Sequence, residues 1–80
     1  MTVTVLLFAS YADALGMRSM AIDFAPGATV RDVISHVRAL PGAERLPVQP
    51  LVAVNETYAK TDHLLNAGDE VAIIPPVAGG

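Results

Sequence analysis

The sequence predicts an α+β domain in which a mixed β-sheet curls around one main helix. Three observations predict this class. Four short segments have the apolar patterns of β-strands, one central segment repeats apolar residues at helical spacing, and 80 residues leave no room for a second hydrophobic core. Hydrophobic residues make up 52% of the chain and charged residues 16%, compared with about 45–50% and about 25% in an average soluble protein, which excludes a disordered chain.

The first expected strand covers residues 2–8, where apolar side chains alternate between the two faces. The alternation assigns Leu6 and Phe8 to the face that points away from the core, so Phe8 is expected to be exposed. Ser10 is expected to cap a short helical turn that ends at Gly16, and a second strand follows over residues 19–24. The residues of the first strand that are assigned to the core are Val3, Val5 and Leu7.

The main helix is expected to begin after Thr29. Thr29 and Asp32 have the spacing of a helix N-terminus, with a capping side chain and an acidic residue in the first turn. The Pro41-Gly42 pair then stops the helix, because proline lacks a backbone donor and clashes with the preceding turn. The apolar residues that recur at helical spacing are Val30, Val33, Ile34, Val37 and Leu40.

The second half of the chain contains the remaining strands. A short buried strand is expected at residues 51–54, a weakly pairing segment at 57–59 and the last strand at 70–74. Asn55-Glu56 connects the first two of these segments as a turn. Two residues before the last strand are expected to plug the core: Leu64 and Leu65.

This order of elements fits a β-grasp fold, in which the first and last strands lie side by side and parallel. The outer faces of these two strands then adjoin. Leu6 and Phe8 are expected near Ala72 and Ile74, in an exposed apolar patch that leads to the end of the chain. Tyr58 is expected either at the rim of a partner interface on this patch or as a cap on the small strand pair.

Charge and composition exclude several functions. The formal net charge is −3 and the five cations are scattered singly, so no basic stripe is present to bind nucleic acid or anionic lipid. The chain has no cysteine, which excludes disulfides, thiolate metal sites and thiol nucleophiles. The longest strongly apolar run, residues 5–9, is far shorter than the ~20 residues that span a bilayer. We therefore expect a soluble, cytoplasmic protein with no membrane partner.

The sequence also predicts no metal site and no bound cofactor. His36 and His63 have no second ligand or catalytic partner at a recognisable spacing. No glycine-rich loop runs from a strand into a helix with a lysine in place, so we expect that this chain does not bind ATP itself.

Residues 75–80 are expected to form a flexible tail on a single domain that comprises residues 1–80. Pro75 and Pro76 end sheet pairing and hold the backbone extended, while Gly79 and Gly80 leave the terminal carboxylate unhindered. A carboxylate is a poor acyl donor, and its usual activation is conversion to an acyl-adenylate by a partner that uses ATP. Because chain ends are commonly disordered, a Gly-Gly end alone is also compatible with an inert tail.

Three blocks of the sequence resemble the small subunit of molybdopterin synthase. They are Val52-Ala53-Val54-Asn55, Gly68-Asp69-Glu70-Val71-Ala72 and Pro75-Pro76-Val77-Ala78-Gly79-Gly80, and the spacing between them also matches. Leu7-Phe8-Ala9 followed by Leu15-Gly16 is similar to the first strand and helical turn of the same family. The resemblance thus covers nearly the whole chain, and the second and third blocks together are fairly specific.

The resemblance implies a ubiquitin-like sulfur carrier for molybdenum cofactor biosynthesis, which is not an enzyme by itself. In that family an adenylating enzyme, similar to ubiquitin-activating enzymes, uses ATP and Mg to convert the C-terminal glycine to an acyl-adenylate. A sulfurtransferase then replaces AMP to leave a thiocarboxylate. The tail enters the large subunit of the synthase, where two rounds of sulfur transfer to cyclic pyranopterin monophosphate create the dithiolene.

Carried onto this chain, the resemblance makes Gly80 the reacting residue and Gly79 the slender residue before it. Residues 75–78, which are Pro75, Pro76, Val77 and Ala78, are the lead that enters the large subunit. The implied assembly is a heterotetramer with the large subunit. The residues expected at the partner interface are Phe8, Leu6, Ile74 and Tyr58.

The sequence departs from the family pattern at two places that we expect on partner surfaces. Ile73-Ile74 replaces a frequent aromatic pair, and Ala12 replaces a frequent arginine. Three other functions share the same features: sulfur delivery for thiamine or cysteine synthesis, a ubiquitin-like modifier that joins Gly80 to lysines of target proteins, and an interaction module with an inert tail.

Overall fold

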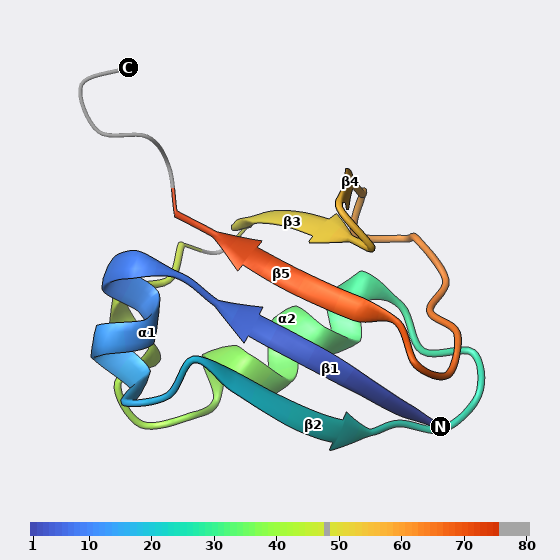
Figure 1. Cartoon of the computed structure of the whole chain (residues 1–80), viewed down its shortest axis with the longest axis horizontal. Helices are drawn as coiled ribbons and strands as arrows, with labels where there is room; N and C mark the ends of the chain where they lie inside the picture. The colour runs from blue at the N-terminus through green and yellow to red at the C-terminus, as the bar shows by residue number, and fades with distance from the viewer. Residues whose placement is uncertain (48, 76–80) are drawn as a thin grey trace.

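The computed structural model describes residues 1–47 and 49–75, and its five strands form one mixed sheet in the order β2-β1-β5-β3-β4 (Figure 1). The central strands β1 and β5 are parallel, and the other pairs are antiparallel. The elements in chain order are β1 (Thr2–Leu7), α1 (Ala9–Leu15), β2 (Ser19–Asp23), α2 (Val30–Arg38), η1 (Ala43–Arg45), β3 (Leu51–Val54), β4 (Thr57–Tyr58) and β5 (Glu70–Ile74). This arrangement confirms the predicted α+β class and the predicted parallel pairing of the first and last strands.

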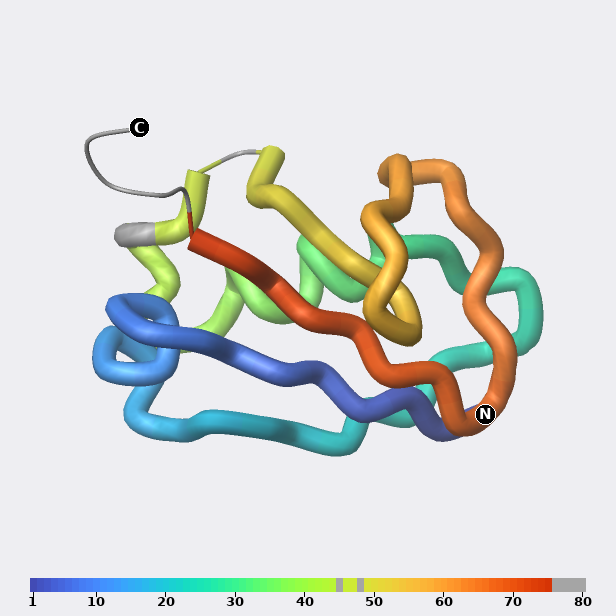
Figure 2. Tube along the Cα trace, turned by 45° about the horizontal axis from the view of Figure 1, so that its top comes forward, coloured from blue at the N-terminus to red at the C-terminus, as the bar shows by residue number. Residues whose placement is uncertain are grey.

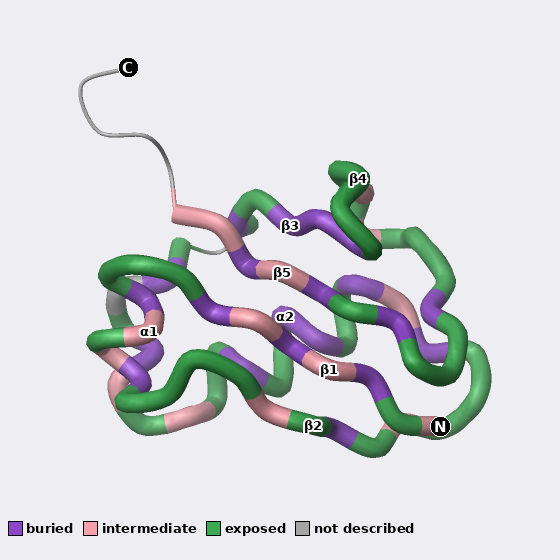
Figure 3. Tube along the Cα trace, viewed as in Figure 1, coloured by how far each residue is buried: buried purple, intermediate pink, exposed green. Residues whose placement is uncertain are grey.

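The core lies between α2 and the inner face of the sheet, where strand alternation and helical spacing direct apolar side chains to the same layer. In Figure 3 buried positions alternate with less buried ones along β1 and β5. This core supplies most of the stability of the domain, because burial of apolar surface is the main favourable contribution to folding. The large side chains that are fully buried are Val3, Val5, Val30, Val33, Val37, Val71 and Ile73.

The predicted start of α2 is confirmed in detail. The Thr29 backbone N–H donates to the Asp32 carboxylate at 2.8 Å, and the Thr29 side chain completes a capping box. The loop before β5 satisfies further N–H groups of the first turn: the Val30 N–H donates to the His63 carbonyl and the Arg31 N–H to the Thr61 carbonyl. Figure 2 shows this loop running beside the start of α2. The helix ends at Arg38, and Leu40 is half-buried beyond it.

The structure corrects two of the predicted details in the first helix and the last loop. Helix α1 begins at Ala9, with Phe8 as its N-terminal cap residue, so Ser10 does not cap it. The backbone turns here because β1 ends at Leu7, and no side chain caps the helix. Leu65 is buried in the core as predicted. Leu64 is 62% exposed, because successive side chains of an extended backbone point to opposite sides.

Gly42 allows the segment after α2 to approach α1 closely. Its φ is 91°, and an added Cβ would collide with the backbone carbonyl of Ala14. Tyr11 and Leu15 anchor the other side of α1 in the core, and burial raises the pKa of Tyr11. Helix α1 is thus fixed at one end of the sheet, beside the C-terminal ends of β1 and β5 (Figure 1).

Among the described residues, no helix is long and apolar enough to cross a membrane.

Candidate functional site

The outer face of the sheet carries one row of residues that crosses four strands. Strand register pairs Leu6 of β1 with Ala72 of β5, Ala72 with Ala53 of β3, and Ala53 with Tyr58 of β4. The small alanines in the middle leave a groove with a volume of about 380 Å³. We call this feature the outer groove, and its lining residues are Leu6, Phe8, Ala53, Glu56, Tyr58, Glu70, Ala72 and Ile74.

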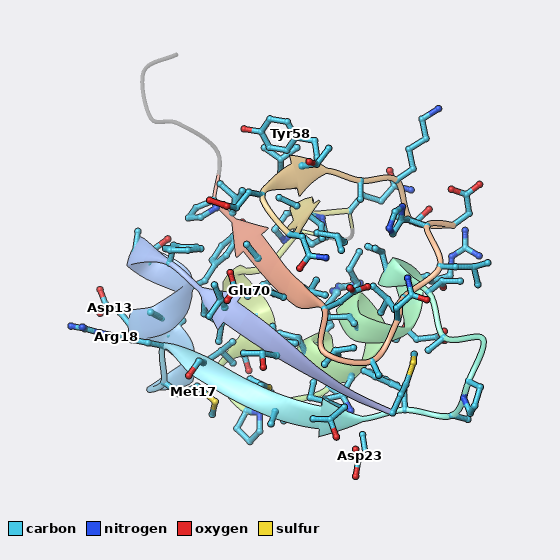
Figure 4. All side chains as sticks on the ribbon, turned by 45° about the vertical axis from the view of Figure 1, so that its right-hand side comes forward. Asp13, Met17, Arg18, Asp23, Tyr58 and Glu70 are labelled. Carbon is cyan, nitrogen blue, oxygen red and sulfur yellow. The ribbon has the colours of Figure 1, made fainter. Side chains whose placement is uncertain are left out.

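The structure brings all four residues that were predicted for a partner interface to this groove. Phe8 is 46% exposed and Tyr58 is 69% exposed, while Leu6 and Ile74 are half-buried. In Figure 4 Tyr58 projects from β4. Such a contiguous apolar surface is typical of a site that another protein covers. The role of these residues in binding a partner stays a prediction.

Phe8 lies at the boundary of the outer groove and a second hollow beside α1. This second hollow has a volume of about 560 Å³, and Leu6 and Phe8 line both hollows. Its polar wall carries Asp13 and Arg18, which lie at the same end of the molecule in Figure 4. Strand parity alone could not predict this hollow, because it depends on where the chain turns from β1 into α1.

The two departures from the family pattern fall in different environments. Ile73 is fully buried in the core, so the expectation that it belongs to a partner surface is wrong. Strand alternation explains the difference, because only Ile74 of this pair points to the outer face. Ala12 is half-buried and lines the second hollow.

The end of β5 lies next to the outer groove. Ile74 lines the groove, and Pro75, which is half-buried, follows it directly. β5 pairs with β1 as far as Leu7 and Ile73, so the last strand ends at the same edge of the sheet as Phe8. The other residues of the predicted tail lie outside the described residues; they are Pro76, Val77, Ala78, Gly79 and Gly80.

Asp69 is a buried carboxylate that fixes the opposite end of the groove. It accepts a hydrogen bond from the Asn66 backbone N–H at 2.8 Å and another from the Asn55 side-chain amide at 2.9 Å. The Asn55 side chain in turn accepts the Glu70 backbone N–H at 3.0 Å. The hydrogen bond from the Asn66 backbone is the main cause of a lowered pKa of Asp69. The hydrogen bond from the Asn55 side chain and the nearby His63 also help to hold this pKa below its usual range.

Sequence reasoning missed this network. Asn55 and Asp69 each follow or precede a strand, which is a signal for turns, but nothing local indicates that the two turns meet. The network joins the β3–β4 turn, which contains Glu56, to the start of β5 at Glu70, and both glutamates line the groove.

The histidines do not build a metal site in the part of the chain that the structure describes. No group of three His, Cys, Asp or Glu side chains there is arranged to hold a metal ion. His36 lies edge-on to the ring of Phe24, with the ring centroids 6.0 Å apart, and His63 is exposed in the loop before β5.

The sheet order, the parallel central pair and the single long helix define a ubiquitin-like β-grasp protein with an exposed apolar groove beside the exit of its last strand. Comparison with known proteins shows which family within this class the chain belongs to. The family model of the ThiS family matches residues 5–80, and the chain belongs to this family.

The relatives agree with this assignment over the whole chain. The sequence is 37% identical over 83 residues to the molybdopterin synthase sulfur carrier subunit of Escherichia coli (strain K12), with 98% of this chain and 99% of that protein covered. The solved structure of the small archaeal modifier protein 1 of H. volcanii has a TM-score of 0.85 and 30% identity, with 95% of this chain and 98% of that chain covered.

A third comparison shows the fold alone. A chain in the protein–protein complex of subunits 1 and 2 of the molybdopterin-converting factor from Helicobacter pylori has a TM-score of 0.75 and 20% identity, with 100% of both chains covered.

Proposed function

We propose that the protein is the sulfur carrier subunit of a molybdopterin synthase. The observation that carries the proposal is the position of the outer groove directly beside the end of β5, in a chain that aligns over almost its full length with sulfur carrier subunits. A partner that covers the groove would therefore also receive the residues that follow Pro75.

The proposed reaction uses the C-terminal carboxylate of Gly80 and no side chain of this chain. A carboxylate oxygen attacks the α-phosphate of ATP on an adenylating partner, which releases pyrophosphate and leaves an acyl-adenylate. A persulfide on a sulfurtransferase then attacks the acyl carbon and AMP leaves, which gives an acyl disulfide. A thiol reduces the S–S bond of this disulfide, and the thiocarboxylate remains on Gly80. In the synthase the thiocarboxylate sulfur forms a C–S bond to a carbon of the pterin precursor while a C–O bond of that carbon breaks and its oxygen leaves. Water then cleaves the acyl–sulfur bond, which leaves the sulfur on the pterin and restores the Gly80 carboxylate.

This proposal makes the chain a carrier whose catalytic groups lie on its partners. ATP and Mg bind to the adenylating enzyme, and Pro75, Pro76, Val77 and Ala78 lead the tail into the large subunit. The absence of cysteine in the sequence supports this division, since sulfur is then held only on the terminus. The proposed assembly with the large subunit is a heterotetramer.

Reconstitution tests the proposal. Thiocarboxylated protein, mixed with the synthase large subunit of the same genome and cyclic pyranopterin monophosphate, is expected to form the dithiolene product. The variant without Gly80 serves as the control and is expected to form none. Product formation that does not depend on Gly80 would contradict the proposal, and transfer to a thiamine or cysteine precursor instead would assign the carrier to another pathway.

The likeness to an archaeal modifier protein favours a second candidate, in which Gly80 forms isopeptide bonds with lysines of other proteins. This function needs the same adenylation but a different acceptor. Mass spectrometry of digested cell extracts would show remnants of the tail on lysine side chains. Their presence would support the modifier, and their absence in cells that make the thiocarboxylate would exclude it.

A further inference from the structure

The outer groove changes from apolar to acidic along the direction of β5. Ile74, Ala72 and Glu70 lie on its outer face, because side chains alternate along a strand. Ile74 lies four residue steps along the strand from Glu70, which corresponds to about 13 Å. Glu70 is the first residue of β5 and Ile74 is the last, so Glu70 lies at the end of the strand that is farther from Pro75. The groove therefore has an apolar end at Ile74, next to Pro75, and an acidic end at Glu70, where β5 begins.

A second carboxylate belongs to the acidic end. Glu56 lines the groove together with Glu70, and both side chains are exposed. No cation is among the residues that line the groove in the described part of the chain. A partner that covers these two carboxylates without neutralising them would bury uncompensated charge at high cost.

Glu56 also occupies a backbone position that disfavours a side chain. Asn55 and Glu56 are the two central residues of the β3–β4 turn, and their φ values are 48° and 72°. Turns of this kind favour glycine at the second central position, since L-residues rarely adopt a left-handed backbone. The chain thus places a carboxylate at the groove at the expense of its own stability, which is typical of residues at functional sites.

We propose that the partner which covers the outer groove presents basic side chains, arginine or lysine, to Glu56 and Glu70, about 13 Å from its apolar contact with Phe8 and Ile74. This inference rests on the proposed function, because the occupant is the synthase large subunit that receives the tail. The charge pairs fix the orientation of the carrier, so that the apolar end of the groove and the tail meet the partner in one register.

Binding kinetics test this proposal. The double variant Glu56→Gln with Glu70→Gln is expected to associate with the large subunit about three- to tenfold more slowly than the wild type at about 0.1 M salt. At about 1 M salt, where charges are screened beyond about 3 Å, the difference is expected to fall below about twofold. Glu44→Gln removes an exposed carboxylate that does not line the groove, and it is expected to bind like the wild type.

A single substitution separates a role in binding from a role in folding. Glu56→Gly relieves the left-handed backbone, so the Tm is expected to rise by about 3–6 °C. The same variant is expected to associate more slowly at low salt. If Glu56 had a purely structural role, the Tm and the association rate of Glu56→Gly would change in the same direction. That result would contradict the proposal.

The failures of the two proposals can be distinguished. A complex whose affinity and salt dependence are the same for the wild type and the double variant would overturn the charge pairing and leave the carrier function intact. Failure of the wild type to bind the large subunit at any salt concentration would overturn both. Self-association of the free protein through the groove, measured by sedimentation and abolished in the double variant, would assign these carboxylates to a second copy and overturn the proposal.

Discussion

Asp69 is the buried polar residue on which the acidic end of the groove depends. Its two hydrogen bonds come from the Asn66 backbone and the Asn55 side chain, so removal of the carboxylate leaves both donors without a partner. We expect Asp69→Ala to lower the free energy of unfolding by about 1–3 kcal/mol at pH 7, measured by urea denaturation. Asp62→Ala, a change at an exposed carboxylate in the preceding loop, is the control and is expected to have little effect.

Asp69 also predicts a dependence of stability on pH. Because hydrogen bonds lower its pKa in the folded protein, its contribution is complete above the unfolded pKa of about 3.9. The contribution is lost as the pH falls below that value and through the lower pKa of the folded state. Asp69→Asn is therefore expected to show a shallower loss of stability in acid than the wild type. Parallel pH profiles for the two proteins would contradict this account.

Gly42 and Gly27 share a backbone conformation but differ in their surroundings. Their φ values are 91° and 93°, yet a Cβ at Gly42 would meet the Ala14 carbonyl, whereas a Cβ at Gly27 would meet open space. We expect Gly27→Ala to cost about 1 kcal/mol of unfolding free energy from backbone strain alone, and Gly42→Ala about 2–4 kcal/mol. Equal losses in thermal denaturation would show that α1 does not need this close approach.

At the scale of elements, Phe8 connects β1 to α1 and lines both hollows. Phe8→Asp is expected to weaken association with the large subunit at least about tenfold, because it places a charge in a desolvated apolar contact. Its effect on Tm is expected to be small, since the side chain is already half exposed. Calorimetric titration measures the affinity, and an unchanged value would remove Phe8 from the interface.

Leu64→Asp is the matched control for this substitution. Leu64 is also a large exposed apolar residue, but it lies in the loop before β5 and does not line either hollow. We expect it to bind the large subunit like the wild type. Equal weakening by both substitutions would indicate a general effect of charge rather than a contact at Phe8.

The elements that local sequence patterns define could be predicted. β1, α2 and β5 follow from alternation, helical spacing and the Thr29–Asp32 cap, and all three patterns act within a few residues. The start of α1 could not be predicted, because tertiary contacts of Tyr11 and Leu15 hold a helix that no side chain caps. The Asn55–Asp69 contact was missed because it joins residues that are distant in sequence.

At the scale of the whole molecule, the core and the proposed reacting group come from different parts of the sequence. In the described part of the chain, the large fully buried side chains come from residues between Val3 and Ile73, whereas the proposed chemistry uses Gly80. The outer patch could be predicted from parity and the parallel central pair, whereas the tail stays a prediction from composition. The acidic end of the groove could not be predicted from local patterns, because it depends on the register of β5 with β1 and β3.

This separation predicts that the end of the chain can change without effect on the fold. Deletion of Gly80, or addition of one serine after it, is expected to shift the Tm by less than about 2 °C, because glycine has no side chain to contribute to an apolar core. Both variants are expected to lose sulfur transfer completely. The deletion removes the Gly80 carboxylate, and the added serine converts it to a peptide bond. Transfer by either variant at the wild-type rate would contradict the proposed chemistry.

The measurement that tests the central claim most directly is the intact mass of the protein after incubation with ATP, the adenylating enzyme and a sulfur source. We predict a mass increase of about 16 Da, the difference when sulfur replaces one carboxylate oxygen, located on Gly80 by fragmentation. An unchanged mass with an adenylating enzyme that is active on another carrier, or an increase located elsewhere in the chain, would contradict the account.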